Sequence, residues 1–429
     1  METLNRSLPP AFKQVQHMDI IEAAEHKLDN NIPLYVINSG TQDLVKIEML
    51  FRAGCWYESK RLVSSAVNSM LNEGTQLHSA DEIANGMDYY GAFFHTENGA
   101  DWSSVTVYTL TKYLEQTLPL LKEILTQSIF PQKELETYIQ NKKLHLIVDN
   151  ERVDFVARKK FAELIFGTEH PYGYYATSQD YDNLNQSDLI TFYKQFYTAD
   201  NCKVIASGKV SDEVIQQLNK YIGAKDWTSN SKIESAGIFN SQSTKQKKQL
   251  ISKEDSIQSA IRIGKILFNK LHPDYFGMQI LNTVLGGYFG SRLMANIRED
   301  KGYTYGIGSA VASNNQEGYF FITTETGVDV CQKAIDEIYF ELKRLRTELI
   351  PEEELQLVKN YILGTFLRSV DGPFELADKL KGIVTYDLSY EYYTNFINTI
   401  KTITAETLRV LANKYLQEES MTELVVGKK

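Results

Sequence analysis

Several features common in other proteins are scarce or missing in this sequence, and each absence excludes a class of protein. The chain has only three cysteines, Cys55, Cys202 and Cys331. They are too widely spaced for a Cys-x-x-Cys metal or redox motif, which fits a reducing compartment. No apolar run reaches the roughly 18 residues of a membrane-spanning helix. Basic residues number 45 against 55 acidic ones, and the net charge of −10 repels nucleic-acid phosphates and anionic lipids. We therefore expect no nucleic-acid partner and no membrane insertion.

Residues 1–20 also lack the apolar run of a signal peptide. We expect a cytoplasmic protein if Met1 is the natural start, and a periplasmic one if a signal peptide has been removed. The 429 residues are 43% hydrophobic and 23% charged, as is typical of soluble globular proteins. At about 150 residues per domain, the length allows two to four domains.

Three short motifs recur at nearly the same offset, which indicates an internal duplication. The pairs are residues 130–136 and 350–356, 184–189 and 403–408, and 204–208 and 423–427, with offsets of 220, 219 and 219. Between the copies, residues 228–249 are rich in Ser, Asn, Gln and Lys, as solvated linkers are. We therefore expect an N-terminal domain over 1–228, a linker over 229–249 and a C-terminal domain over 250–429.

Each copy begins with a strand pattern and continues with helical patterns. Residues 44–51 and 260–266 alternate apolar and polar side chains, as half-buried strands do. A long amphipathic stretch begins near Pro131 in the first copy and near Pro351 in the second, each with Glu close behind, a helix-start pattern. These patterns predict two homologous α+β domains.

Residues 61–72 predict a helix that has an apolar stripe on one face and is ended by Gly74. The opposite face carries Ser65, Asn68 and Ser69, at the spacing of the inverted zinc motif H-x-x-E-H. A hydroxyl is a poor zinc ligand, and an amide cannot act as the base that activates water. Taken alone, this pattern indicates a solvated or hydrogen-bonded polar face.

The order of the motifs resembles the pitrilysin/insulinase family of zinc metallopeptidases, which includes the mitochondrial processing peptidase and the respiratory-complex core proteins. Residues 51–58 and 65–75 resemble the family's strand, R-x-G turn and motif helix with its Gly-Thr ending. Residues 285–293 and 297–305 resemble its second-half signature. The resemblance extends over about residues 22–427 and implies two processing-peptidase-like halves.

The resemblance also implies that the metal site is lost. Active members have His, Glu and His where this chain has Ser65, Asn68 and Ser69. The family's third ligand falls near His145, which without partner ligands is expected to be a packed or surface residue. We therefore expect no metal cofactor in this chain and zinc only in a partner subunit.

The family's substrate-side pair is still present according to the resemblance, as Arg298 and Tyr305. A guanidinium can hold a substrate carbonyl, and a phenol can donate to the oxyanion that forms when water attacks a peptide. The Gly-rich segment 286–290 lacks the spacing of a phosphate-binding loop, and we expect it to form a turn near the substrate chamber.

In the paired members of the family, one subunit carries the zinc helix and the other carries the Arg and Tyr. The resemblance therefore implies a non-zinc subunit of a heterodimeric metallopeptidase, which binds the peptide substrate and completes the site of a zinc-bearing homologous partner. No peptidase activity is expected from the chain alone. The alternative is a non-catalytic scaffold or peptide-binding protein, which has no need of Arg298 and Tyr305. An independent serine hydrolase is a third reading, but the sequence has no G-x-S-x-G motif.

Overall fold

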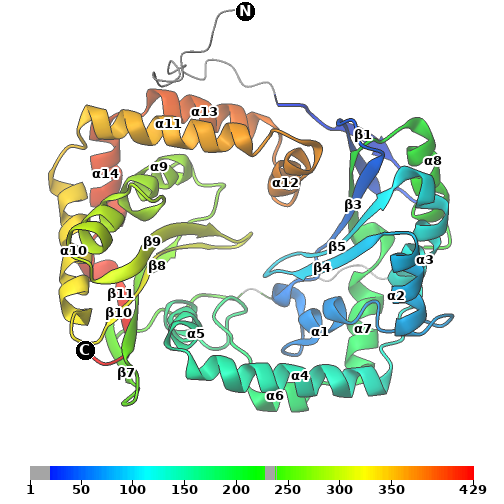
Figure 1. Ribbon diagram of the computed structural model, residues 1–429, viewed down its shortest axis with the longest axis horizontal. Coiled ribbons are helices and arrows are strands. Elements are labelled where there is room, and N and C mark those ends of the chain that lie inside the picture. Colours follow the sequence, from blue (N-terminus) through cyan, green and yellow to red (C-terminus); the bar gives the residue numbers. More distant parts are fainter. Residues whose placement is uncertain (1–19, 228–236, 238) are drawn as a thin grey trace, which may run out of the picture.

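The protein consists of two similar halves, each built around one β-sheet (Figure 1). A computed structural model describes residues 20–227, 237 and 239–429. The first sheet has the strand order β1-β2-β6-β3-β5-β4 and the second has the order β7-β11-β8-β10-β9. The pairs β2–β6 and β7–β11 are parallel, and the other neighbours are antiparallel. The expected architecture of two homologous α+β units is confirmed.

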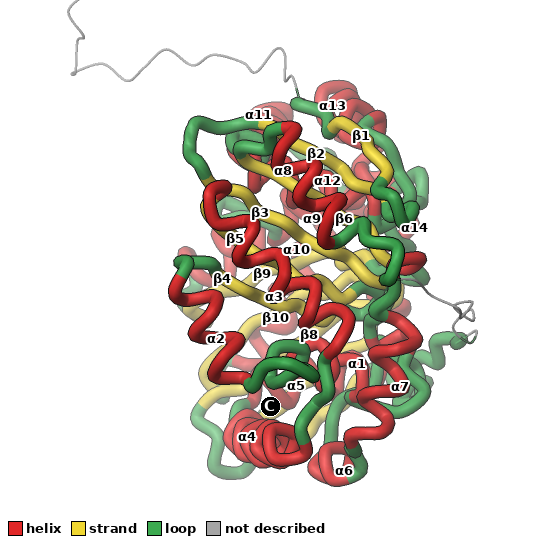
Figure 2. The backbone as a smooth tube through the Cα atoms, turned by 90° about the vertical axis from the view of Figure 1, so that its right-hand side faces the viewer, coloured by secondary structure: helices red, strands yellow, loops and turns green. Residues whose placement is uncertain are grey.

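The first half contains six strands and eight α-helices among its described residues. The strands are β1 (Ala24–Lys27), β2 (Pro33–Asn38), β3 (Leu44–Phe51), β4 (Phe93–Asn98), β5 (Ser103–Leu110) and β6 (Cys202–Gly208). The helices are α1 (Val63–Ser69), α2 (Ala80–Tyr89), α3 (Leu114–Gln127), α4 (Gln132–Glu151), α5 (Val153–Phe166), α6 (Ser178–Asp182), α7 (Gln186–Phe196) and α8 (Asp212–Tyr221). Figure 2 shows α3 and α8 lying across the strands of the first sheet.

The second half has five strands, six α-helices and one π-helix. The strands are β7 (Lys248–Ser252), β8 (Gln258–Leu267), β9 (Thr304–Ser313), β10 (Gly318–Gly327) and β11 (Thr422–Gly427). The helices are α9 (Tyr275–Gly286), the π-helix η4 (Met294–Asp300), α10 (Cys331–Thr347), α11 (Glu352–Arg368), α12 (Pro373–Val384), α13 (Glu391–Thr402) and α14 (Ala405–Tyr415).

The three repeated motifs occupy equivalent places in the two halves. The first pair spans the beginnings of α4 and α11, which start directly after Pro131 and Pro351. The second pair starts α7 and α14, whose N-cap side chains accept a hydrogen bond from the backbone three residues later. The third pair lies in β6 and β11, each the parallel partner of one strand and the antiparallel partner of another. The duplication therefore reflects a repeated topology.

Helix α1 is shorter than the 61–72 pattern predicts. Leu62 has a φ of 71°, in the left-handed region, so regular helix begins only at Val63, and it ends at Ser69. Met70 and Leu71 nevertheless stay buried in the core of the first half. The apolar pattern therefore identifies the buried side chains correctly but not the limits of the helix.

The predicted linker is described only in part, because residues 229–236 and 238 lie outside the described residues. The later part is tied to the end of α5, where the amides of Gln242 and Thr244 donate to the carbonyls of Phe166 and Leu164, both at 2.8 Å. Strand β7 begins at Lys248, within the stretch that the composition assigns to the linker.

Each sheet is covered on one face by a helix from the other half. Helix α5 of the first half packs its buried residues Phe161 and Ile165 against Leu424 and Val426 of β11. Helix α12 begins 220 residues after α5 and packs against the first sheet. The residues in that second contact include Leu376, Ala377 and Leu380 of α12 with Ile37, Leu50 and Ile205 of the sheet. The exchange is reciprocal, so neither sheet is fully covered without the other half.

Charged residues reinforce the contact between α12 and β3. Lys46 and Glu48 are buried on the face of β3 that also carries Leu50. Lys46 Nζ lies 2.7 Å from a carboxylate oxygen of Asp378, and Lys381 Nζ lies 2.7 Å from one of Glu48. Buried charges need such partners, so this network fixes where α12 sits.

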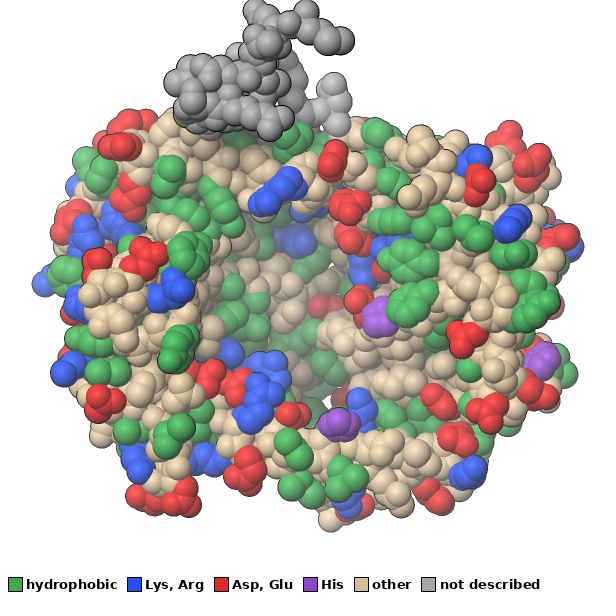
Figure 3. Space-filling model, in the orientation of Figure 1, with side chains coloured by type: hydrophobic (Ala, Val, Ile, Leu, Met, Phe, Trp, Pro, Cys, Tyr) green, Lys and Arg blue, Asp and Glu red, His purple; other side chains and the backbone are tan. Residues whose placement is uncertain are grey.

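The chain surrounds a central hollow that is open on the face shown in Figure 3. The turn between β9 and β10 reaches across to the first half, where the amide of Asn315 donates to Asp101 at 2.8 Å. Asp101 also accepts a 2.5 Å hydrogen bond from the Tyr172 hydroxyl. Among the described residues, no helix has the length and apolarity needed to cross a membrane.

Because the halves complete each other, destabilising the second sheet should unfold both. All three tryptophans, Trp56, Trp102 and Trp227, lie in the first half. Trp102 also packs against the cluster that contains α12, so their fluorescence reports on the first half and on its contact with α12. Leu424→Ala in β11 removes a fully buried side chain at a cost of about 2–5 kcal/mol. We expect urea midpoints from fluorescence and from circular dichroism to fall together.

The matched control is Leu189→Ala in α7, which is equally buried but lies in the core of the first half. It should lower both midpoints too. Independent folding of the two halves would instead give two transitions in circular dichroism, of which Leu189→Ala would shift only one.

Candidate functional site

Arg298 lies in an irregular helix. Residues 294–300 form the π-helix η4, a geometry that is rare and often found at functional sites. The Arg298 side chain is about one-third exposed. The π-helix therefore places the Arg298 guanidinium at the surface, beside strand β9.

Tyr305 lies in a β-bulge at the start of β9, the free edge strand of the second sheet. Thr304 pairs with Thr326 and Ile307 with Thr324, so Tyr305 and Gly306 lie opposite a single residue of β10. The Thr304 hydroxyl donates to the Glu325 carbonyl at 2.6 Å, which holds the bulge in place. Bulges redirect side chains, and here the Tyr305 side chain is 93% exposed.

The structure brings Arg298 and Tyr305 together through the backbone. The Nε of Arg298 donates to the Tyr305 carbonyl at 3.0 Å. Its guanidinium carbon lies 4.8 Å from the ring centre of Phe289, in the Gly-rich turn. No hydrogen-bond partner of the Tyr305 hydroxyl is found in the part of the chain that the structure describes. The Arg298 guanidinium is thus held by the Tyr305 carbonyl and the Phe289 ring, while the Tyr305 side chain faces solvent.

Two of the three motif positions on the polar face of α1, Ser65 and Asn68, are hydrogen-bonded within the protein. The Ser65 hydroxyl donates to the Leu62 carbonyl at 3.1 Å. The Asn68 amide is buried and donates to the Tyr197 hydroxyl at 3.1 Å and to the Ser104 carbonyl at 3.3 Å. Ser69 is exposed.

The residue of α4 that reaches this face is Tyr138. Burial raises the pKa of its phenol to about 12, and the nearby Ser65 and Ser69 hydroxyls offset only part of that rise. His145 is exposed on the same helix. It is seven residues further on, which at 1.5 Å per residue is roughly 10 Å along the axis.

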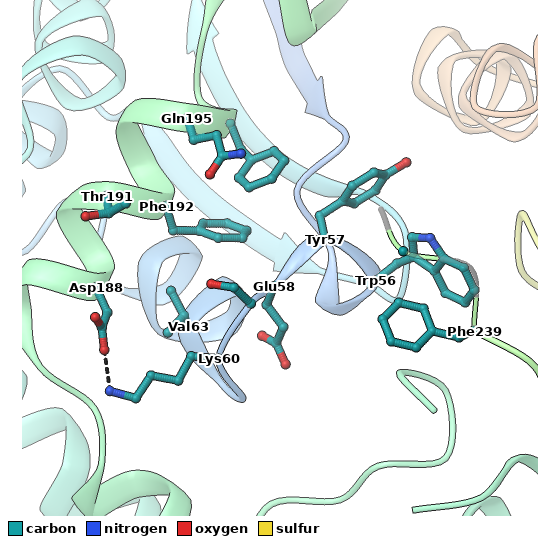
Figure 4. A pocket seen from close by; sticks show the side chains of 13 residues that line it. Trp56, Tyr57, Glu58, Lys60, Val63, Asp188, Thr191, Phe192, Gln195 and Phe239 are labelled. Carbon is teal, nitrogen blue, oxygen red and sulfur yellow. Dashed lines mark hydrogen bonds and ion pairs between the residues drawn. The ribbon is translucent and has the colours of Figure 1, made fainter. Parts of the chain in front are cut away.

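A cavity of about 350 Å³ lies between the beginning of α1 and helix α7 (Figure 4). Aromatic rings of Trp56, Phe192 and Phe239 line it, together with Glu58 and the ion pair of Lys60 with Asp188.

The Glu58 carboxylate in this cavity serves the beginning of α1. It accepts hydrogen bonds from the Leu62 amide at 3.2 Å, the Ser64 amide at 3.1 Å and the Ser64 hydroxyl at 2.9 Å. Burial nevertheless raises the pKa of Glu58 to about 7, because these hydrogen bonds offset only part of the desolvation. Glu58 thus supports the left-handed turn at Leu62 from which the helix starts.

Comparisons with known proteins agree with this geometry. Residues 183–362 match the family described as "Peptidase M16 inactive domain". A crystal structure of a peptidase M16 inactive domain from Pseudomonas fluorescens superimposes with a TM-score of 0.83 and 20% identity, covering 95% of this chain and 99% of that one. A protease from Helicobacter pylori superimposes with a TM-score of 0.84 and 16% identity, covering 95% and 100%. The chain is similar in sequence and in fold to the M16 peptidases. The resemblance inferred from the motifs is confirmed.

Some curated relatives are named as zinc proteases and others as non-peptidase homologues. The uncharacterized zinc protease YmxG of Bacillus subtilis is 22% identical over 402 residues, which cover 92% of this chain and 96% of that protein. The non-peptidase homolog YmxG of Helicobacter pylori is 22% identical over 326 residues, covering 74% of each. Because these names differ, whether this chain can bind zinc is judged from the side chains of α1.

These residues do not fit the zinc of the active M16 peptidases. Ser65, Ser69 and Tyr138 supply only neutral hydroxyls, and the Asn68 amide is committed to Tyr197 and Ser104. Zinc sites are built from imidazole, thiolate and carboxylate. Across residues 20–227, 237 and 239–429, no three His, Cys, Asp or Glu side chains are grouped so as to hold a metal ion. The chain is an M16-like protein without the zinc motif.

Sequence reasoning singled out Arg298, Tyr305 and the motif positions of α1, but not the residues that pack beside them. Phe289 lies in the Gly-rich turn that the sequence did single out, yet only the fold puts its ring against Arg298. Tyr138 is seven residues before the position that motif spacing indicated, and only the packing of α4 on α1 identifies it.

Glu58 should make stability depend on pH. The pKa of this carboxyl group rises from 4.5 to about 7 on folding. Its contribution to the stability of the folded state is therefore fully present below pH 4.5 and is lost as the pH rises through 7. Glu58→Gln stays uncharged. The unfolding free energy of Glu58→Gln minus that of wild type should therefore be larger at pH 8 than at pH 5, by about 1–3 kcal/mol.

Urea unfolding at pH 5, 6, 7 and 8 measures this difference. Glu169→Gln, at a side chain that is 88% exposed, is the control and should follow wild type at every pH. A constant difference between Glu58→Gln and wild type across the range would contradict the buried-carboxyl interpretation.

Proposed function

We propose that this chain is the non-zinc subunit of a heterodimeric zinc metallopeptidase and supplies Arg298 and Tyr305 to the active site of a zinc-bearing homologous partner. The observation that carries the proposal is the paired irregularity at this site, a π-helix at Arg298 and a β-bulge at Tyr305. Departures from regular structure need compensation elsewhere, and they are retained mostly where function needs them.

The chemistry of the two side chains fits peptide hydrolysis. With Nε held by the Tyr305 carbonyl, the other guanidinium nitrogens of Arg298 can donate to a substrate carbonyl. The exposed Tyr305 hydroxyl can donate to the oxyanion of the tetrahedral intermediate. Neither group activates water, so the metal and the general base must come from the partner.

The position of β9 supports a peptide substrate. As the outermost strand of its sheet, β9 has backbone groups that β10 does not pair. An extended peptide can add to such an edge by main-chain hydrogen bonds. The bulge at Tyr305 would then lie at one end of the added strand.

The alternative is a non-catalytic scaffold or peptide-binding protein, which the loss of the zinc motif on α1 also permits. It leaves the exposure of Tyr305 and the anchoring of Arg298 without a role. A serine hydrolase finds no support, since the Ser65 hydroxyl donates to a backbone carbonyl.

The decisive experiment pairs this chain with a homologue of similar length from the same organism that carries H-x-x-E-H. The two purified chains are assayed separately and mixed, with and without chelator, on a quenched fluorescent peptide. Chelator-sensitive cleavage by the mixture only supports the proposal. Chelator-insensitive cleavage by this chain alone overturns it, and a mixture that neither associates nor cleaves favours the scaffold.

In the active mixture, Tyr305→Phe should lower kcat by about 100-fold or more, the scale on which one oxyanion donor contributes. Association should survive, because this side chain is 93% exposed and makes no internal contact through its hydroxyl within the described residues. Stopped assays with size-exclusion chromatography measure both. Tyr89→Phe, at another tyrosine that is 83% exposed, is the matched control.

Arg298→Ala should raise KM as well as lower kcat, because a guanidinium that grips a ground-state carbonyl also contributes uniform binding. Arg298→Lys should rescue poorly, since an ammonium cannot both bond the Tyr305 carbonyl and present a second donor in the same plane. Full activity of the Arg298→Ala, Tyr305→Phe double variant would remove both residues from the mechanism.

A further inference from the structure

The cavity at the beginning of α1 combines aromatic walls with a carboxylate (Figure 4). Figure 4 shows the Glu58 side chain between Lys60 and the Trp56 ring. Phe192 of α7 forms another wall, and both it and Trp56 are buried. The volume of about 350 Å³ lies at the small end of the roughly 300–1,000 Å³ typical of ligand pockets. The cavity therefore has the size and the mixed lining of a site for a small ligand.

Glu58 is the charged residue of this cavity that lacks a counter-ion. Lys60 forms an ion pair with Asp188. The next cation along the chain, Arg61, pairs with Glu169 at 3.0 Å. In the part of the chain that the structure describes, Glu58 itself forms no ion pair. The lining of the cavity thus has one more acidic side chain than basic ones.

The Glu58 carboxylate also keeps some capacity to accept a hydrogen bond. A carboxylate has about four acceptor positions, and the two amides and the hydroxyl of Leu62 and Ser64 use three of them. These donors are neutral, so they leave the negative charge without a cation. An ammonium group beside aromatic rings meets both needs, because it donates to the carboxylate and is attracted to the faces of the rings.

We propose that this cavity binds a small organic ammonium ion. The Glu58 carboxylate accepts a hydrogen bond from the ammonium group, and the Trp56 and Phe192 rings pack against the apolar part of the ligand. A neutral ligand of the same shape lacks the charged hydrogen bond, and an anion is repelled by Glu58 and Asp188. This inference concerns the first half alone and does not depend on the proposed partner.

Two probes of the same shape test the proposal on the full-length chain. 2-Phenylethylamine carries the ammonium group, and 2-phenylethanol replaces it with a neutral hydroxyl. Isothermal titration calorimetry at pH 8 measures both affinities. The amine should bind at least about 10-fold more tightly, because a charged hydrogen bond and a cation–π contact are stronger than their neutral counterparts.

A third probe distinguishes two sources of the ammonium group. Nα-acetyl-lysine amide carries only a side-chain ammonium and represents lysine within a peptide. Saturable binding of this probe supports a peptide side chain as the ligand. Binding of 2-phenylethylamine without binding of the lysine probe supports a free amine.

Three substitutions change the charge of the cavity in opposite directions. Glu58→Gln removes the carboxylate charge, and Asp188→Asn leaves Lys60 without its partner. Each should weaken binding of the amine by about 10-fold or more. Lys60→Gln removes the cation and should strengthen it. Glu151→Gln, at a side chain that is 83% exposed, is the matched control and should bind both probes as wild type does.

The affinity for the amine should rise with pH. An alkylammonium like that of lysine has a pKa of about 10.4 and stays charged at neutral pH. Burial raises the pKa of Glu58 to about 7, so its carboxyl group must lose a proton before it can pair with the ligand. From pH 6 to pH 8 the affinity of wild type should therefore increase by about 10-fold, whereas that of Glu58→Gln should not change.

The other groups around the carboxylate do not supply this pH dependence. They are the Arg61 guanidinium, the ion pair of the cavity, the Cys55 thiol and the phenols of Tyr138 and Tyr174. Burial raises the pKa of the thiol and of the Tyr138 phenol to about 12, and it also raises that of Tyr174. His170, which packs against Trp56, has its pKa lowered by burial. Binding of 2-phenylethanol over the same pH range is the control for these groups.

Several results would overturn the proposal. One is the absence of saturable amine binding at pH 8, and another is equal affinity for the amine and the alcohol. A third is unchanged amine binding by Glu58→Gln in a variant whose circular dichroism matches wild type. If that variant does not fold, Asp188→Asn and Lys60→Gln decide the matter, since equal amine affinities in these two variants would contradict a site selected by charge.

Discussion

The packing of α5 and α12, each on the sheet of the other half, is the interaction on which the rest of the structure depends. A sheet with two apolar faces needs a cover on both. In each half the chain's own helices cover one face, and the second cover arrives from the other half. The buried charges of Lys46 and Glu48 then find partners on α12. Without the exchange, these charges and the apolar residues around them would face water.

The duplication is therefore more than a repeat of sequence. Two copies of one unit that trade an equivalent helix have the form of a swapped dimer, here joined by the segment between α8 and β7. Covalent connection keeps the local concentration of the second copy high. It also frees the copies to diverge, and they have: the first carries the altered motif helix α1, whereas the second carries Arg298 and Tyr305 in irregular backbone.

Regular features of the fold could be predicted from the sequence, and irregular ones could not. The alternation over 44–51 matches β3 at both ends, and the prolines before α4 and α11 mark where those helices begin, because such starts obey local rules. The limits of α1 depend instead on a left-handed Leu62 that Glu58 supports through tertiary hydrogen bonds. No local pattern predicts the π-helix at Arg298 or the bulge at Tyr305, since neither is set by residue preference alone. Tyr138 was missed for the same reason, because its place is decided by how α4 packs on α1.

The bulge in β9 also bears on the protein's solubility. An exposed edge strand offers a regular row of backbone donors and acceptors to which another chain can pair, and edge-to-edge pairing leads to aggregation. Here the extra residue at Tyr305 and Gly306 interrupts that row near one end. The Thr304 and Thr324 hydroxyls bond to backbone carbonyls around the interruption, at 2.6 and 2.9 Å, and so hold it open against straightening. The same irregularity that exposes a tyrosine therefore shortens the stretch of β9 along which two copies of this chain could pair.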